Sequence, residues 1–123
     1  AKRALPLSVS VPSHCALMKP AADKLAVALK NITFNTPIFS VVNNVDVKIE
    51  TSADAIRDAL VRQLYNPVRW TETVEFMAAQ GIEDLLEAGP GKVLTGLTKR
   101  IVKTLTSSAV NDMSSLETAL ENR

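Results

Sequence analysis

The spacing of apolar residues changes from two to three or four positions along the first third of the chain. Between Leu5 and Val11 every second residue is apolar, which predicts a half-buried strand that Pro12 ends. From Ala16 to Leu29 the apolar residues recur every three or four positions, as on one face of a helix. Proline is tolerated in the first turn of a helix, so Pro20 indicates where the regular helix begins.

The middle third contains one short apolar run followed by two helical patterns. Ile38 to Val42 is typical of a strand buried on both faces, and residues 45–49 indicate a small extension or a hairpin arm after it. Thr51 and Asp54 have the spacing of a capping box, which predicts the start of a helix. Asn66-Pro67 predicts a second helix, with asparagine as N-cap and proline at the first position.

The last third repeats the alternation of strand and helix. Gly81 ends the second helix, and residues 82–88 form a strand pattern that stops at Gly89-Pro90-Gly91. A helical face over residues 93–102 and a weak strand over 105–110 follow, and Ser114 with Glu117 predicts a capping box for a terminal helix. The order β-α-β-α-α-β-α-β-α with short connections predicts an α/β fold in which helices cover a mostly parallel sheet.

Composition and charge narrow the function classes. The 123 residues carry a net charge of +1 without a long basic cluster, so neither nucleic acid nor a membrane surface is expected as a partner. No apolar run approaches the length that spans a bilayer, and no signal peptide is recognisable. A single cysteine excludes an internal disulfide and favours a reducing compartment, so we expect a cytoplasmic protein. The chain begins with Ala1 instead of Met, so we expect a piece of a longer polypeptide.

The only histidine and the only cysteine, His14 and Cys15, are adjacent at the predicted strand-to-helix junction. Histidine is suited to acid–base catalysis because its pKa in water lies near neutrality. From the residues alone, His14 is either a general base or a structural histidine. Neighbouring side chains on a helix do not face each other, so Cys15 is interpreted as a packing residue and not as the partner of His14. No group of histidine, cysteine and acidic residues has metal-ligand spacing, so neither a metal nor a bound cofactor is expected.

Four segments carry a resemblance to a known family. They are VPSHCALM at 11–18, VVNNVD at 41–46, QLYNPVRW at 63–70 and EAGPGKVLTGL at 87–97. In this order they resemble the C-terminal portion of bacterial malonyl-CoA:acyl carrier protein transacylases. The match extends from the first predicted strand to the last predicted helix and therefore covers essentially the whole chain.

The resemblance implies a fold and a reaction. Residues 1–12 would be the end of a small ferredoxin-like subdomain, and residues 13–123 part of a hydrolase-like acyltransferase core. The implied reaction belongs to fatty acid biosynthesis and passes malonate from coenzyme A to a serine and then to the phosphopantetheine thiol of acyl carrier protein. The implied partners are acyl carrier protein, the substrate malonyl-CoA and the N-terminal part of the same enzyme.

The resemblance also assigns residues. His14 occupies the position of the catalytic base, Gln63 would orient it through the main-chain carbonyl, and Ser13 is a candidate for lining the acyl pocket. The Gln63 assignment is physically reasonable, since the last carbonyls of a helix lack intrahelical donors and the helix dipole there favours a cation. No G-x-S-x-G segment, which carries the family's serine, occurs in these residues, and neither does the family's carboxylate-binding arginine motif. We therefore expect this chain to be catalytically incomplete by itself.

Two other interpretations remain open. If these residues are the entire natural chain, the missing serine motif favours a non-catalytic α/β module that binds an acyl carrier or another subunit. The acyltransferase domain of a polyketide synthase fits less well, because the four segments follow the free-standing bacterial form. Gly89-Pro90-Gly91 is interpreted as a tight turn and not as a phosphate-binding loop, since the spacing to Gly96 does not fit G-x-G-x-x-G.

Overall fold

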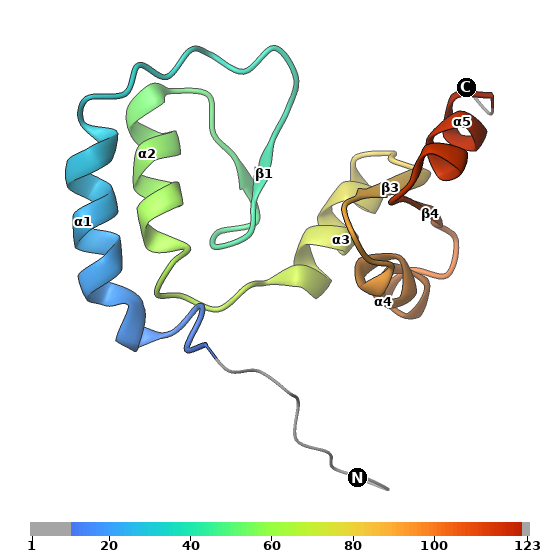
Figure 1. The fold of residues 1–123 in the computed structure, drawn as a ribbon, viewed down its shortest axis with the longest axis horizontal. Helices are drawn as coiled ribbons and strands as arrows, with labels where there is room; N and C mark the ends of the chain where they lie inside the picture. Colours follow the sequence, from blue (N-terminus) through green and yellow to red (C-terminus); the bar gives the residue numbers. More distant parts are fainter. Residues whose placement is uncertain (1–10, 122–123) are drawn as a thin grey trace, which may run out of the picture. The chain divides into compact units, whose positions relative to one another are not determined.

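The computed structural model describes residues 11–121 and divides into two compact units between Arg69 and Trp70 (Figure 1). The described helices and strands, in chain order, are the 3-10 helix η1 (Ala16–Met18), α1 (Lys19–Leu29), β1 (Val42–Asn43), β2 (Lys48–Ile49), α2 (Ala53–Arg62), α3 (Trp70–Ala79), β3 (Asp84–Ala88), α4 (Val93–Ile101), β4 (Thr106–Val110) and α5 (Met113–Glu121). The predicted first strand falls largely on residues 1–10 and so lies outside the described residues.

In the first unit, α1 and α2 pack side by side (Figure 1). The chain between them folds into the antiparallel hairpin β1–β2, in which Val42 pairs with Ile49 and Asn43 with Lys48. This confirms the predicted hairpin arm. The buried apolar residues of this unit come from both helices and from the hairpin turn: Ala22, Leu29, Val45 and Ala59.

Arg57 of α2 holds the C-terminal end of α1. Its Nε donates a hydrogen bond to the Leu29 carbonyl at 3.1 Å, and its Nη2 donates to the Ile32 carbonyl at 2.9 Å. The guanidinium also lies 5.0 Å from the ring centroid of Phe34, a cation–π distance. The Leu29 carbonyl also accepts the Ile32 N–H at 3.2 Å, so Arg57 adds a side-chain donor at the helix end and joins α1 to α2.

The second unit is built on a parallel pair of strands. All five residues of β3 pair with β4 in register, from Asp84 with Thr106 to Ala88 with Val110, and α4 forms the crossover between the strands. Helices α4 and α5 pack against β4, and α3 packs against α4. Val74 and Thr98 are fully buried at the centre of this unit. The α/β class predicted from the sequence is confirmed, and the finer hydrolase-like assignment and the division at residue 12 stay predictions.

The helix α3 ends as its sequence predicts. Gly81 has φ +85°, a left-handed conformation that costs glycine little, and the Ile82 N–H donates to the Met77 carbonyl at 3.2 Å. The chain then reverses into β3.

Two predicted helix starts are wrong in detail. Helix α2 is capped by Ser52 and not by Thr51, since the Ser52 Oγ accepts from the Ala55 N–H at 3.3 Å. Before α5, Asp112 and Ser115 form the reciprocal box: the Ser115 N–H donates to Asp112 Oδ1 at 2.8 Å, and the Asp112 N–H donates to Ser115 Oγ at 3.1 Å. The box predicted at Ser114 and Glu117 is therefore displaced, because several serine, threonine and acidic residues offer competing registers.

The buried strand predicted over Ile38 to Val42 is also wrong for the described chain. Only Val42 enters a ladder, while Ile38 is 95% exposed and Phe39 71% exposed. Among residues 11–121, the segment has only the short β2 as a strand partner, so nothing in this part of the chain covers its apolar side chains.

The Gly89-Pro90-Gly91 turn leads to a helix end that is already occupied. The Glu87 carboxylate accepts from the Thr95 N–H at 2.7 Å, the Thr95 Oγ1 at 2.7 Å and the Leu94 N–H at 3.2 Å. These hydrogen bonds, that of the Thr95 N–H first, lower the pKa of Glu87. A protein carboxylate thus takes the place that a phosphate would need, which supports the interpretation as a tight turn.

Candidate active site around His14

His14 lies in a tight loop just before η1. Its φ of +56° is in the left-handed region, which is uncommon for a residue with a side chain and is found frequently at functional sites. The preceding turn is closed by the Ser13 N–H, which donates to the Val11 carbonyl at 2.9 Å. This conformation leaves His14 exposed at the surface of the first unit.

The imidazole of His14 meets the end of α2. His14 Nδ1 lies 2.8 Å from the main-chain carbonyl oxygen of Gln63, across 49 positions of sequence. A carbonyl oxygen only accepts, so this hydrogen bond requires the proton on Nδ1. The other ring nitrogen, Nε2, then carries the free lone pair that a general base needs.

The carbonyl of Gln63 is available because Gln63 is the C-cap of α2. Its own N–H still donates to the Ala59 carbonyl at 3.0 Å, so the residue belongs to the last helical turn. A helix C-terminus also carries partial negative charge, which favours a cation beside it. A ring that becomes positively charged in this position is therefore stabilised by the backbone of α2.

Cys15 and Ser13 have different surroundings from His14. Cys15 Sγ donates to the Pro12 carbonyl at 3.3 Å, so the thiol is engaged within its own turn. This agrees with the interpretation of Cys15 as a structural residue. Ser13 is exposed and is not among the residues that line the cavity beside α2, and its role as an acyl-pocket residue stays a prediction.

A second contact joins α1 to the end of α2 near His14. The Lys19 ammonium lies 5.4 Å from the ring centroid of Tyr65, and it also pairs with the Asp23 carboxylate one turn further along α1. The loop that carries His14 thus precedes a helix that is attached to α2 at both ends, here and through Arg57. Because of these two attachments, the distance between His14 and Gln63 is set by more than the one hydrogen bond between them.

The hairpin β1–β2 is tied to the same helix end by Arg62, which the sequence interpretation missed. Both terminal nitrogens of Arg62 donate to the Asp46 carboxylate, at 2.8 and 2.6 Å, while its Nε donates to Asp58 at 2.5 Å. The guanidinium lowers the pKa of Asp46, and the two carboxylates raise that of Arg62. The spacing of Asp58 and Arg62 signals a helical ion pair, whereas no local pattern connects Arg62 to Asp46.

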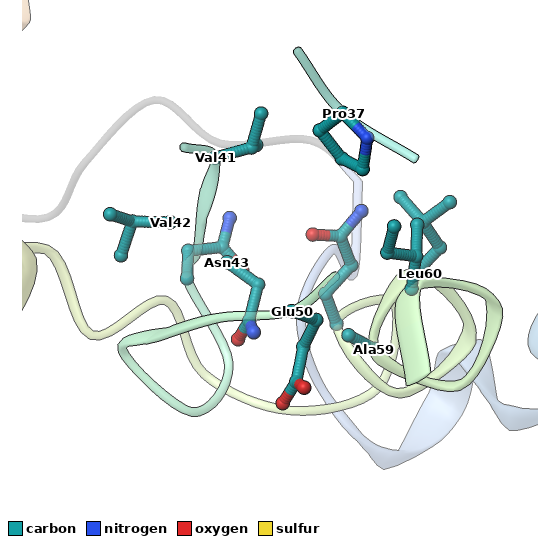
Figure 2. A pocket seen from close by; sticks show the side chains of 10 residues that line it. Pro37, Val41, Val42, Asn43, Glu50, Ala59 and Leu60 are labelled. Carbon is teal, nitrogen blue, oxygen red and sulfur yellow. The ribbon is translucent and has the colours of Figure 1, made fainter. Parts of the chain in front are cut away.

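A cavity of about 210 Å³ lies between the hairpin segment and α2 (Figure 2). Figure 2 shows Val41, Val42 and Asn43 on one side of it and Ala59 and Leu60 on the other. The complete lining is mostly apolar with a few polar side chains: Pro37, Val41, Val42, Asn43, Asn44, Glu50, Ile56, Ala59, Leu60 and Gln63. Gln63 is therefore shared, since its carbonyl binds His14 and the same residue borders the cavity.

Two features are absent from residues 11–121. Within this range, no three histidine, cysteine or acidic side chains gather in a way that could hold a metal ion. None of the helices described here is long and apolar enough to cross a bilayer.

The chain is similar to malonyl CoA-acyl carrier protein transacylases of several bacteria. No family model matches the chain. It is 77% identical over 121 residues to the malonyl CoA-acyl carrier protein transacylase of Escherichia coli K12 and 41% identical over 121 residues to that of Bacillus subtilis 168. These alignments cover 98% of the chain but only 39% and 38% of the relatives. The chain thus spans about two-fifths of the length of the relatives it matches.

Solved structures give the same result. One is a malonyl-transacylase in complex with a type II polyketide synthase acyl-carrier protein, with a TM-score of 0.93, 77% identity and coverage of 99% of this chain and 40% of that one. Another is an acyl carrier protein S-malonyltransferase from Vibrio cholerae, with a TM-score of 0.89, 69% identity and coverage of 96% and 39%. By sequence and by fold, the chain is similar to about two-fifths of a malonyl-CoA:acyl carrier protein transacylase.

Proposed function

We propose that this chain supplies the catalytic base of an enzyme that transfers malonyl from coenzyme A to the phosphopantetheine thiol of acyl carrier protein. The observation that carries the proposal is the hydrogen bond from His14 Nδ1 to the Gln63 carbonyl at 2.8 Å. It leaves Nε2 unprotonated in the neutral ring. The names of the relatives supply the substrate and the acceptor.

The reaction needs a serine that these 123 residues do not present in a G-x-S-x-G segment. In the first half, Nε2 of His14 takes the proton of the serine hydroxyl as its oxygen attacks the malonyl thioester. The bond from carbonyl carbon to sulfur breaks, the imidazolium returns the proton to the coenzyme A thiolate, and malonyl remains as a serine ester. In the second half, His14 takes the proton of the phosphopantetheine thiol and the thiolate attacks the carbonyl carbon of the ester. The bond from that carbon to the serine oxygen breaks, and the proton returns to the serine.

Gln63 acts on this reaction through its backbone. Its carbonyl holds the imidazole in the tautomer with Nδ1 protonated, and the negative end of α2 favours the imidazolium that forms in each half-reaction. Ser13, one residue before the base, is proposed to border the acyl group in the substrate complex.

The test is the substitution His14→Ala in the intact enzyme, with malonyl transfer to acyl carrier protein as the measurement. We expect a loss of about 10²–10⁴-fold, the usual contribution of a general base. Cys15→Ala is the matched control, because Cys15 is adjacent in sequence and its thiol bonds only within its own turn, and it should stay within a few-fold of the wild type. Activity of His14→Ala near that of the wild type would remove His14 from the mechanism.

A further inference from the structure

The carbonyl of Gln63, the C-cap of α2, lacks the backbone N–H that would normally donate to it. In an α-helix, the carbonyl of residue i accepts the N–H of residue i+4. For Gln63 that residue is Pro67, and proline has no N–H. The helical partner of the Gln63 carbonyl is therefore missing for a covalent reason, and His14 Nδ1 donates to this oxygen at 2.8 Å.

The carbonyl of the preceding residue, Arg62, accepts hydrogen bonds from residues that follow α2. The Arg62 carbonyl accepts from the Asn66 side-chain amide at 2.7 Å and from the Tyr65 N–H at 3.3 Å. The predicted role of Asn66 as N-cap of the next helix is therefore wrong, since α3 begins only at Trp70. Asn66 completes the end of α2 instead, because its side chain reaches back by four residues.

Proline also keeps the helix from continuing. The residue before a proline is disfavoured in the α conformation, so Asn66 cannot extend α2 by another turn. The N–H of Arg69, beyond the proline, donates to the Asn44 carbonyl at 3.0 Å and fixes the departing chain on the hairpin. The Gln63 carbonyl is thus left at the helix end, facing His14.

We propose that Pro67 is a positioning residue for the base: it reserves the Gln63 carbonyl for His14 because it withholds the backbone N–H that would compete for this oxygen. This inference rests on the proposed function of His14. A residue with an N–H at position 67 could donate to the Gln63 carbonyl across a turn of five residues, a contact with little chain entropy to overcome. The His14 hydrogen bond would then share its acceptor or lose it.

The test must separate the missing N–H from the stiffness of the proline ring. Pro67→Ala introduces the N–H and removes the ring. Lactic acid in place of Pro67, introduced by nonsense suppression, has the shape of alanine but carries an ester oxygen where alanine has its N–H. The two variants of the intact enzyme therefore differ in the one group that the proposal concerns.

In steady-state malonyl transfer, we expect Pro67→Ala to lower kcat about tenfold with KM nearly unchanged, because a hydrogen bond to a group that becomes charged is weakened. The lactic acid variant should return to within about threefold of the wild type. Pro90→Ala, in the turn after β3, is the control for removing a proline and should leave kcat unchanged. Equal impairment of the alanine and lactic acid variants, or wild-type kcat in Pro67→Ala, would overturn the proposal.

A spectroscopic measurement reads the same effect without turnover. In enzyme labelled with ¹⁵N-histidine, the His14 signals are identified by their loss in His14→Ala. We expect the protonated ring nitrogen to be Nδ1 in the wild type and in the lactic acid variant, and a mixture of both tautomers in Pro67→Ala. An unchanged tautomer in Pro67→Ala would contradict the inference. Wild-type activity in His14→Ala would instead defeat the proposed function, so the two failures are distinguishable.

Discussion

At the residue scale, His14 depends on a main-chain oxygen where many catalytic histidines use a carboxylate. A carbonyl holds the tautomer as a carboxylate does, but it carries only partial charge and cannot itself take a proton. It is also present in every amino acid. The contribution of Gln63 therefore does not depend on the identity of its side chain.

We accordingly expect Gln63→Ala in the intact enzyme to retain malonyl transfer within a few-fold of the wild type. The substitution keeps the carbonyl and places a good helix former at the end of α2. Transfer assays of Gln63→Ala beside His14→Ala make the comparison. A loss in Gln63→Ala as large as that in His14→Ala would show that the side chain, and not the backbone, supports the base.

The lowered pKa of Glu87 predicts how the stability of the fold depends on pH. The hydrogen bonds from Thr95 and Leu94 lower its pKa below the ordinary value of 4.5. The unfolded state then binds the proton more readily, so the stabilisation by Glu87 is fully present above about pH 4.5 and is lost as the pH falls through the lower folded pKa.

Denaturant unfolding of the intact enzyme and of Glu87→Gln at pH 6 and pH 3.5 measures this effect. The difference in unfolding free energy between the two proteins should shrink at the lower pH. Asp112, whose pKa is lowered by the Ser115 hydroxyl and N–H, should behave in the same way, so Asp112→Asn provides a second case of the same pH effect. A difference that stays constant across the range would contradict the assignment.

At the element scale, α2 organises the first unit. Its N-terminal half holds the end of α1 through Arg57, its C-terminal half holds the hairpin through Arg62, and its last carbonyls bind Asn66 and His14. One helix therefore sets the position of the loop with the proposed base and of the hairpin beside its cavity. Substitutions along α2 should act on the site even where they do not touch His14.

The two carboxylates on Arg62 offer a matched comparison at this scale. Asp46 binds the guanidinium through both oxygens and is 30% exposed, whereas Asp58 is 64% exposed and makes one hydrogen bond. We expect Asp46→Asn to destabilise the protein by about 1 kcal/mol or more, and Asp58→Asn by less than about 0.5 kcal/mol. Denaturant unfolding of both variants decides the order, and an equal or reversed effect would show that the hairpin is held by other contacts.

At the scale of the whole molecule, the described chain presents apolar side chains that its own elements do not cover. Ile38, Phe39 and Val41 are each more than half exposed, next to the cavity that borders Gln63. The relatives are about two and a half times as long as this chain, which covers 39% of the Escherichia coli protein. The exposed apolar side chains agree with the expectation that residues outside this chain cover them in the longer relatives.

A prediction follows for the 123 residues by themselves. They contain no G-x-S-x-G segment, so we expect the isolated chain to transfer no malonyl from malonyl-CoA to acyl carrier protein. A radiolabelled malonyl transfer assay, with the intact enzyme as the positive control, provides the measurement. Turnover by the isolated chain above that of its His14→Ala variant would show that the nucleophile lies within these residues.

Local sequence determined the types of most elements and the chemistry available to the site. Periodicity predicted α1, α2, α4 and the strands β3 and β4, because the spacing of apolar residues follows from the geometry of each element. Gly81 predicted the end of α3, since a left-handed residue is a local requirement. The single histidine in its family context indicated the candidate base.

Only the tertiary structure decided how these parts meet. Ser52 caps α2 in place of Thr51, the Asn66 side chain reaches back to α2, and Arg62 pairs with Asp46. In each case several polar groups compete for one partner, and the packing decides which of them lies within about 3 Å of that partner. The tautomer of His14 depends on an oxygen 49 positions away. Periodicity is a property of neighbours along the chain, whereas hydrogen bonds between elements depend on positions that only the packed helices define.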